Sequence, residues 1–372
     1  MEPKIRFKGF EGGWKEERLS EISSSIASGK NIDHKGPYPL YGSTGIIGTT
    51  DKPYHEGPML LVARVGANAG FLQLVNEKCG VSDNTLIVKP KDPVTDNYLF
   101  QYFKFFNLNR FIYGSGQPLI TGGMLKKMPV RYGLKEERET LIDYFTSLDS
   151  QISASTSRLA SLKQMTAASL QAMFPQEGET VPKIRFKGFE GEWKKVKLGK
   201  LFSERIENNV DGEMLSVTMN NGIIKAAENG RFDNSNSDKS KYKVVKVGDI
   251  AYNSMRMWQG ASGCSQYEGI VSPAYTVVVP NANIHSLFFA YLFKTIPMIN
   301  LFRLHSQGLT KDTWNLKYPA FSIIEVSYPE SKAEQQAIAS YFTSLDRQIS
   351  LQSQRLEKLK QIKSACLDKM FV

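Results

Sequence analysis

Two stretches of the chain carry apolar residues at the alternating four- and three-residue spacing of a heptad repeat. This spacing places the residues along one side of a long helix. We therefore predict two long amphipathic helices that pair with each other, as a coiled coil, through apolar seams. The seams are Leu141, Phe145, Leu148, Ile152, Ser155, Leu159 and Leu162 in one helix, and Ile338, Phe342, Leu345, Ile349, Gln352, Leu356 and Leu359 in the other.

Each seam has a polar residue at the same place, Ser155 or Gln352, and such a residue usually fixes the register of two helices. The second helix begins at Ser331–Glu334, which reads as a capping box whose Ser oxygen and Glu carboxylate satisfy free amides of the first turn. The alternative interpretation is a buried core helix in each half. We favour paired helices whose exposed apolar seams also bind a partner.

The chain also repeats itself. Pro3–Gly12 returns at Pro182–Gly191, an offset of 179 residues, and Tyr144–Asp149 returns at Tyr341–Asp346, an offset of 197 residues. Repeats of this length are too long for a solenoid and indicate a duplicated domain. The segment between the two repeated blocks is 18 residues longer in the second half, so the shared blocks read as a frame and the unequal parts as inserts.

The inserts are related more faintly. Leu60–Arg64, followed by glycines, parallels Asp249–Arg256, and Val81–Val88 parallels Val271–Val278. Each insert is predicted to contain an apolar strand, a glycine-rich turn bearing an arginine, and a second β-branched strand. The residues at the turn tips differ, which suits two related domains that recognise different ligands through their loops.

Length and charge narrow the class of protein. The chain has 372 residues, enough for two or three domains, and a formal net charge of +10. This charge favours a polyanionic partner, most often nucleic acid, although a merely soluble basic protein has the same composition. No apolar run approaches the roughly 18 residues of a membrane span. The repeat begins directly after the first residues without a leader, so we expect a cytoplasmic protein with no membrane partner.

No catalytic motif is recognisable. The phosphate-binding Gly-x4-Gly-Lys-Ser/Thr loop, the Asn/Asp-Pro-Pro-Tyr/Phe loop of adenine methyltransferases and the Gly-x-Gly-x-x-Gly fingerprint are all missing. Glu192–Lys194 imitates the Glu-x-Lys of nucleases but has no plausible upstream acidic partner. The three cysteines and four histidines are dispersed, so neither a disulfide nor a metal site is expected. We predict that the chain recognises rather than reacts.

The chain resembles the specificity subunit of a type I restriction-modification system. The resemblance rests on the repeated Lys-Ile-Arg-Phe-Lys-Gly-Phe-Glu-Gly block, on Pro39–Gly42 and Gly248–Ile250, and on the duplicated Tyr-Phe-x-x-Leu-Asp. It implies an α+β fold in which two target recognition domains each read one half of a split, asymmetric DNA site. Two antiparallel helices would bind two copies of an adenine methyltransferase subunit, and restriction subunits would join the complex. S-adenosylmethionine, ATP and Mg would belong to those partners, with no cofactor in this chain.

The resemblance also implies limits for the parts of the chain. One departure is Arg138, which stands where the second half has Gln335, and Leu134 takes the place of the capping Ser. The implied parts are recognition domains at 1–132 and 183–330, helices at 133–174 and 331–372, and a linker at 175–182.

Base reading needs Arg, Asn, Gln, Ser, Thr or Lys side chains on loops that enter a groove of the duplex. For each candidate the alternative is a solvated loop residue. Arg64 and Arg256 are the strongest candidates because we expect the two halves to place an arginine at equivalent turns, and Trp258 stands beside Arg256. The candidates are Ser43, Thr44, Lys52, Arg64, Asn68 and Gln117 in the first half, and Asn220, Asn221, Lys239, Lys241, Arg256, Gln259 and Gln307 in the second.

Two other functions fit the same sequence. One is a stand-alone DNA-binding regulator, which would bind its site tightly without a methyltransferase. The other is a duplicated interaction scaffold without nucleic acid, which would show no salt-dependent binding to duplex DNA.

Overall fold

The chain divides into two compact units, and each is described by itself. In the computed structural model, unit 1 comprises Met1–Ser157 and Ser353–Val372, and unit 2 comprises Arg158–Gln352. The structure describes residues 2–30, 35–111, 118–219, 221–229, 238–311 and 313–372, without the side chains of residues 93 and 229.

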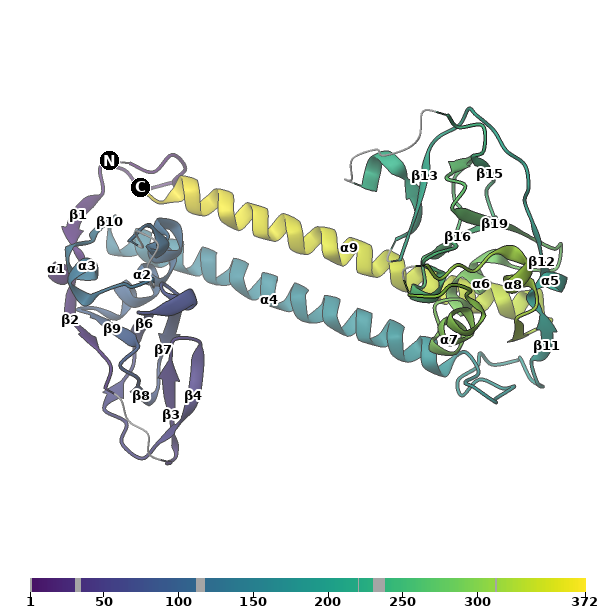
Figure 1. Ribbon diagram of the computed structural model, residues 1–372. Helices are drawn as coiled ribbons and strands as arrows, with labels where there is room; N and C mark the ends of the chain where they lie inside the picture. The colour runs from purple at the N-terminus through teal and green to yellow at the C-terminus, as the bar shows by residue number, and fades with distance from the viewer. Residues whose placement is uncertain (1, 31–34, 112–117, 220, 230–237, 312) are drawn as a thin grey trace. The chain divides into compact units, whose positions relative to one another are not determined.

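Unit 1 is built on two small sheets with α2 packed beside the first (Figure 1). The central strands, β6 and β9, are almost wholly apolar, and their side chains are buried on both faces. The first sheet has the order β2 (Ser23–Ser28), β9 (Thr85–Pro90), β6 (Met59–Ala63), β7 (Leu72–Val75), and the second has the order β4 (Gly45–Thr50), β3 (Tyr38–Gly42), β8 (Lys78–Val81), β5 (His55–Glu56). The remaining elements are β1 (Lys15–Arg18) paired with β10 (Pro129–Tyr132), α1 (Leu19–Ile22), η1 (Gly66–Asn68), α2 (Pro93–Phe106), η2 (Leu108–Phe111) and α3 (Gly122–Lys127).

Unit 2 repeats the four-stranded sheet and varies what surrounds it. Its sheet has the order β12 (Phe202–Glu204), β19 (Tyr275–Pro280), β16 (Ile250–Asn253), β17 (Ser262–Cys264). Three further antiparallel pairs are β13 (Leu215–Thr218) with β14 (Gly222–Lys225), β15 (Lys243–Val245) with β18 (Gly269–Val271), and β11 (Lys194–Lys197) with β20 (Glu325–Tyr328). The short helices are α5 (Leu198–Leu201), η3 (Ala226–Asn229), η4 (Met257–Gln259), α6 (Ser286–Leu292), α7 (Ile296–His305) and α8 (Tyr318–Ser322). The predicted α+β class with two related globular parts is confirmed.

Two long helices, α4 (Lys135–Ala172) and α9 (Lys332–Met370), contribute residues to both units. In unit 1 the Tyr144 hydroxyl on α4 lies 3.3 Å from the Cys366 sulfur on α9, and Asp149 pairs with Lys363. The α9 numbers fall as the α4 numbers rise, so the two helices are antiparallel in unit 1. The predicted long helices are confirmed, whereas the details of a coiled coil and the domain limits stay predictions.

The seam residues are covered within the chain. The polar residues Ser155 and Gln352 are only 4% and 9% exposed. The expectation that the seams are exposed and need a partner's cover is therefore wrong, because the helices and the cores of the units already bury them. Leu148, Leu162, Leu345 and Leu356 are buried, and Ile152, Leu159, Ile349 and Leu359 are half-buried.

The repeated decapeptide, Pro3–Gly12 in unit 1 and Pro182–Gly191 in unit 2, binds the first turn of a long helix in each unit. In unit 1 the Arg6 guanidinium donates two hydrogen bonds to the Glu137 carboxylate, at 2.7 and 2.8 Å, and the Trp14 indole donates a third at 3.2 Å. Glu137 is 1% exposed, so this carboxylate is paired inside the unit.

Unit 2 builds the same arrangement around Glu334. Arg185 donates at 2.7 and 2.8 Å, and the Trp193 indole donates at 3.2 Å. Half of the predicted capping box is present, since the Ser331 hydroxyl accepts from the Glu334 amide at 3.4 Å. The other half is wrong, because the Glu334 carboxylate binds Arg185 and Trp193 instead of an amide of the first turn.

Among the described helices, none is by itself long and apolar enough to span a membrane. The bent pair α6–α7 meets that criterion by length and composition only. Its side chains Phe288, Phe289 and Phe302 lie in the core of unit 2.

Candidate nucleic-acid interface

The first group of candidates in unit 1 lies around a hairpin. Ser43 and Thr44 form the turn between β3 and β4, with Thr44 exposed, and Lys52 is exposed just beyond β4. The Gln73 side chain donates to the Gly42 carbonyl at 2.7 Å and holds the turn against β7. Two exposed isoleucines follow the turn. The hairpin therefore presents hydroxyl and apolar groups together.

The second group lies at the end of β6. Arg64 is held by its backbone, which donates to Asn84 and accepts from Ile120, and Asn68 is exposed in η1. The Arg64 Nε atom is buried and has no hydrogen-bond partner among the described residues. A buried donor without a partner is costly, so a ligand acceptor at this position would be favourable. Gln117 lies outside the described residues.

The candidates of unit 2 also occupy turns. Asn221 is exposed in the β13–β14 turn, where its amide donates to the Thr218 hydroxyl at 3.0 Å. Lys239 and Lys241 precede β15, with Lys241 exposed. Asn220 lies outside the described residues. The remaining candidates are Arg256 and Gln259 at η4, and Gln307 in the loop after α7.

The two hairpins occupy equivalent places in their units, which the sequence did not reveal. Leu40 on β3 pairs in parallel with Gly80, and Met214, just before β13, pairs in parallel with Ile270. The hairpin sequences share no motif, so only the backbone pairing relates them. The candidate residues at the two hairpin tips, in separate units, thus come from matching positions.

Arg64 and Arg256 lie in equivalent turns, as predicted, but two residues apart within the turn. The amide of Arg64 donates to Asn84, and the amide of Ser254 donates to Ala274, both at a sequence offset of 190. The same offset relates the bonds that close the two turns, so the turns have equal lengths. Ser254 is the counterpart of Arg64, and Arg256 is the counterpart of Gly66. The arginines therefore differ in place as well as in surroundings.

The four tryptophans fall into two classes. Trp14 is buried in the core of unit 1 and Trp193 in the core of unit 2. Trp258 and Trp314 are partly exposed and meet edge to face, with ring centroids 5.3 Å apart. The Trp258 indole donates to the Met255 carbonyl at 3.1 Å, which fixes the pair beside Arg256. The aromatic pair is part of the surface that carries the η4 candidates.

A half-buried lysine, Lys294, positions the η4 turn. Lys294 Nζ donates to the carbonyls of Met219 and Gly260, and burial lowers the pKa of Lys294 to about 8. Its counterpart in unit 1, Lys104, faces Asp149 at 3.4 Å, and burial lowers its pKa to about 8 as well. Sequence reasoning missed both lysines. The repeated Phe-Lys pair at the end of an apolar segment is the signal that could have identified them.

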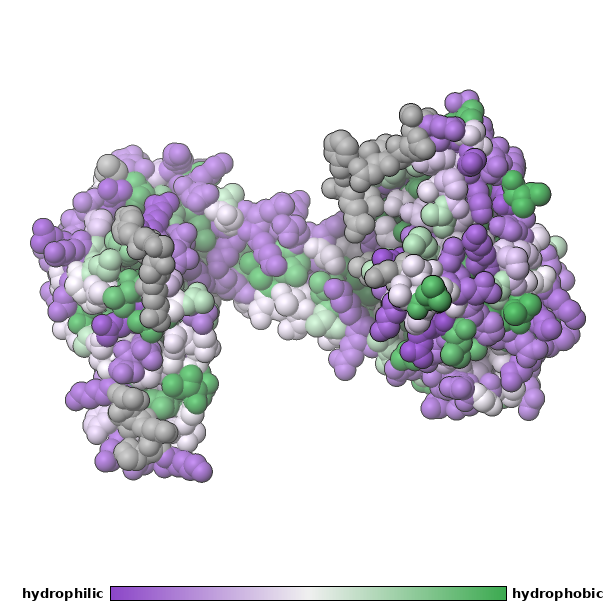
Figure 2. Space-filling view, in the orientation of Figure 1, coloured by the Kyte–Doolittle hydropathy of each residue, from purple (hydrophilic) through white to green (hydrophobic). Residues whose placement is uncertain are grey.

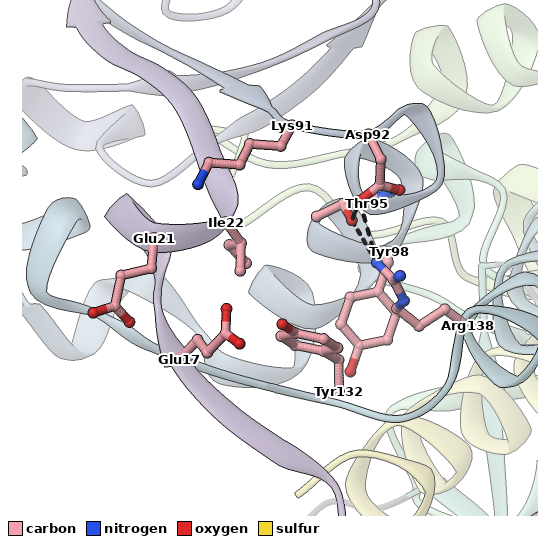
Figure 3. A pocket seen from close by; sticks show the side chains of 9 residues that line it. All are labelled: Glu17, Glu21, Ile22, Lys91, Asp92, Thr95, Tyr98, Tyr132 and Arg138. Atoms are coloured by element: carbon pink, nitrogen blue, oxygen red, sulfur yellow. Dashed lines mark hydrogen bonds and ion pairs between the residues drawn. The ribbon is translucent and has the colours of Figure 1, made fainter.

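Arg138 lines a hollow of about 270 Å³ in unit 1 (Figure 3). Its guanidinium bonds the Thr95 hydroxyl at 2.5 Å and lies 3.6 Å from the Asp92 carboxylate, at the N-terminus of α2. In unit 2 the side-chain carbonyl of Gln335 accepts a hydrogen bond from the backbone amide of His285, which directly precedes α6. Arg138 and Gln335 are different residues at the same place of the repeat, but each binds the start of a neighbouring helix.

In the described part of the chain, no group of three or more His, Cys, Asp or Glu side chains could hold a metal ion. The cysteines Cys79, Cys264 and Cys366 are free, and burial raises the pKa of Cys79 and Cys264 to about 11. Burial thus favours the protonated form of Cys79 and Cys264, and a protonated thiol is a poor nucleophile. The candidate residues thus supply hydrogen-bond donors, acceptors and positive charge on loops, which suits recognition of a polyanion.

Comparison with known proteins identifies a family for the chain. The family described as the type I restriction modification DNA specificity domain matches the chain twice, over residues 11–164 and 190–361. The chain is 26% identical, over 159 residues, to the specificity subunit of the type I restriction enzyme EcoprrI of Escherichia coli. That alignment covers 40% of this chain and 40% of the relative's length.

Solved structures share the fold. The S subunit of a type I restriction-modification system from M. genitalium matches with a TM-score of 0.66 at 15% identity, over 100% of this chain and 99% of that chain. A chain from a structure concerned with complex assembly and conformational transition of the type I R-M system matches with a TM-score of 0.50 at 15% identity, over 97% and 98% of the two chains. Since the two family matches together span most of the sequence, the chain belongs to the type I restriction modification DNA specificity domain family.

Proposed function

We propose that the chain is the DNA sequence-recognition subunit of a type I restriction-modification complex. The observation that carries this proposal is the double match to a DNA specificity domain, one match for each half of the duplicated sequence. Each unit reads one half of a bipartite, asymmetric site. The chain selects the site, and partner subunits carry out the chemistry.

In each unit the hairpin tip and the turn after the central strand supply the base contacts. Ser43, Thr44, Arg64 and Asn68 serve unit 1, whereas unit 2 uses other residue types at matching places. Lysines such as Lys241 bind phosphates, which gives affinity without sequence information. Different side chains on a shared frame let the two units read different bases.

The helices α4 and α9 bind adenine-N6 methyltransferase subunits, two in number. Because the seams are covered within the chain, the partner binds other faces of the helices. Apolar side chains that are exposed there support this proposal: Met165 at 43%, Leu351 at 57% and Ile362 at 37%.

The chain itself is non-catalytic and needs no cofactor. S-adenosylmethionine serves the methyltransferase subunits, and ATP and Mg serve restriction subunits that join through the complex. The complex works in the cytoplasm on double-stranded DNA. These statements rest on membership of the family and on the lack of recognisable catalytic motifs in the sequence.

Coexpression of the chain with the adenine-N6 methyltransferase subunit of a type I system tests the proposal. Genome-wide mapping of methyladenine should show one bipartite, asymmetric motif that disappears when this chain is omitted. With about six to ten phosphate contacts, the complex should bind duplex DNA with a log-log salt slope of roughly −5 to −9.

The same measurements separate the other two functions. If the chain alone binds a DNA site tightly and specifically, and no methylated motif appears with or without the methyltransferase subunit, a stand-alone regulator is favoured. A flat salt dependence for the assembled complex would leave only an interaction scaffold.

A further inference from the structure

One leucine of unit 2 stands fully in solvent at the tip of a closed loop. Leu309 is 101% exposed, the highest value among the exposed large apolar side chains of the described residues. Gln307 and Asn315 close the loop through two backbone hydrogen bonds, at 3.0 and 2.8 Å. Leu309 therefore sits on a short, anchored projection between α7 and α8.

The loop is held in its shape by its own backbone. Gly308 has φ +147°, and a Cβ atom at this position would lie 2.5 Å from the Thr313 carbonyl oxygen. The Thr310 amide donates to the Thr313 hydroxyl at 3.1 Å, and the Thr313 amide donates to the Thr310 carbonyl at 3.0 Å. The contacts across the loop keep its tip narrow, so Leu309 is displayed before any ligand binds.

An aromatic pair lies at the base of the loop. Trp314 meets Trp258 edge to face, and the Leu316 amide donates to the Ser254 carbonyl at 2.8 Å. These contacts attach the loop to the η4 segment. Met255, which precedes η4, is 39% exposed. The loop and η4 thus bring the apolar side chains of Leu309 and Met255 to the surface of unit 2. The face of unit 2 that Figure 2 shows is mainly polar, with apolar side chains at separate places.

The two segments that carry this surface are rich in positive charge. Within residues 253–260 and 303–317, the side chains with a formal charge at neutral pH are the cations Arg256, Arg303, Lys311 and Lys317 and the anion Asp312, a net charge of +3. Asp312 lies outside the described residues. The apolar tip suits a ligand whose interior is apolar and stacked, and the neighbouring cations suit a ligand whose exterior is anionic. Duplex DNA has this construction.

We propose that Leu309 inserts between two adjacent base pairs of the half-site read by unit 2. This inference rests on the proposed function. Apolar side chains that enter a base step partly unstack it and kink the duplex. The Trp258–Trp314 pair supports the loop, and the four cations bind phosphates beside the opened step. The counterpart segment of unit 1 includes residues 112–117, outside the described residues, so the inference concerns unit 2 alone.

Insertion makes the energy of deforming the DNA part of the recognition. Pyrimidine–purine steps unstack more readily than others, so unit 2 prefers such a step where Leu309 enters. The preference requires no hydrogen bond to the bases of that step.

Fluorescence of 2-aminopurine tests the insertion, because this base brightens when it is unstacked. The complex with methyltransferase is bound to duplexes that carry the probe at successive positions of the mapped half-site. Apart from any rise at the adenine that the methyltransferase extrudes for methylation, we expect a rise at one further step with the wild-type chain and loss of that rise with Leu309→Ala. The variant should bind the cognate site roughly fivefold or more weakly. Ile323→Ala is the matched control, because Ile323 is a 55% exposed apolar residue of the same unit, and it should behave as wild type.

The outcomes separate this inference from the proposed function. If the wild-type complex methylates and binds its site but no step other than that of the methylated adenine brightens, or if Leu309→Ala keeps the full signal there, insertion is overturned and the proposed function stands. If the wild-type complex shows no site-specific binding or methylation, the proposed function fails, and the insertion fails with it.

Discussion

The ring of Phe371 meets the indole of Trp14 edge to face, with centroids 6.3 Å apart and an interplanar angle of 84°. Unit 2 contains the same relationship between Phe174 and Trp193, at 6.1 Å and 84°. Phe174 follows the end of α4 and Phe371 follows the end of α9. Each unit thus completes its core with an aromatic residue from a helix that begins in the other unit.

Phe371→Ala should destabilise unit 1. The ring is 3% exposed and contacts four further aromatic rings of that core, so its removal leaves a cavity that costs about 3–5 kcal/mol. Hydrogen exchange should show faster exchange in the sheet of unit 1 and little change in that of unit 2. Leu351→Ala, at an exposed position of α9, is the control. Equal losses of protection in both units would contradict the assignment of Phe371 to one core.

Arg6→Ala should destabilise unit 1 because it leaves the buried Glu137 carboxylate without its cation. The expected cost is about 3–5 kcal/mol, measured by chemical denaturation. Arg6→Ala combined with Glu137→Gln should recover part of the loss. The surface pair Arg131–Glu16 has a similar distance, 2.6 Å, but both partners are more exposed, so Arg131→Ala should cost no more than about 1 kcal/mol through that pair. Similar costs for the two arginines would refute the role given to Arg6.

The sequence identified the decapeptide as a frame but not what it does. Arg6 and Glu137 are 131 residues apart, and neither helical nor strand periodicity relates residues at that distance. The two-residue difference between Arg64 and Arg256 within their equivalent turns has a similar origin, since only the backbone bonds show which positions correspond. The long helices could be predicted because a heptad pattern is local. The equivalence of the two hairpins, β3–β4 and β13–β14, could not be predicted, because their strands have the same backbone pairing but no common sequence motif.

Asp96 should make stability depend on pH. Its side chain is 2% exposed, and burial together with the neighbouring Asp92 raises its pKa to about 7. The unfolded chain ionises near the ordinary pKa of about 4, so folding becomes less favourable as the pH rises from about 4 to 7. Asp96→Asn removes this penalty and should stabilise the chain by roughly 1–3 kcal/mol above pH 7. Thermal midpoints from pH 4 to 8 check it, and a gain that is the same at every pH would contradict the assignment.

Exchange of the recognition part of unit 2 should alter one half of the methylated site. Residues 201–324 can be replaced by the matching stretch of another family member, since β11 and β20, which frame the insert, remain paired in the same register. Methylome sequencing should show one half-site changed and the other kept. The reciprocal exchange in unit 1 is the control. Changes in both halves from a single exchange would refute independent reading.

A fragment of residues 1–176 should form a symmetric dimer. It contains the recognition part of unit 1 and all of α4, but it lacks α9, whose final turn completes the core of unit 1. The ends of the two helices match, since Ala172-Met173-Phe174 corresponds to Lys369-Met370-Phe371. The Ile5 amide donates to the Lys369 carbonyl, just as the Ile184 amide donates to the Ala172 carbonyl.

The end of α4 in one copy of the fragment can therefore replace the end of α9 in the other. Burial of the seam and of Phe174 at about 25 cal/mol per Å² stabilises this exchange by several kcal/mol. The exchange is reciprocal, so the dimer has a twofold axis and two identical recognition parts. With methyltransferase it should modify a palindromic site, built from the half-site of unit 1, with centres about one helical turn apart. Light scattering and methyladenine mapping check both statements, with Phe174→Ala expected to weaken the dimer. An asymmetric site, or a fragment that stays monomeric and unfolded, would refute the exchange.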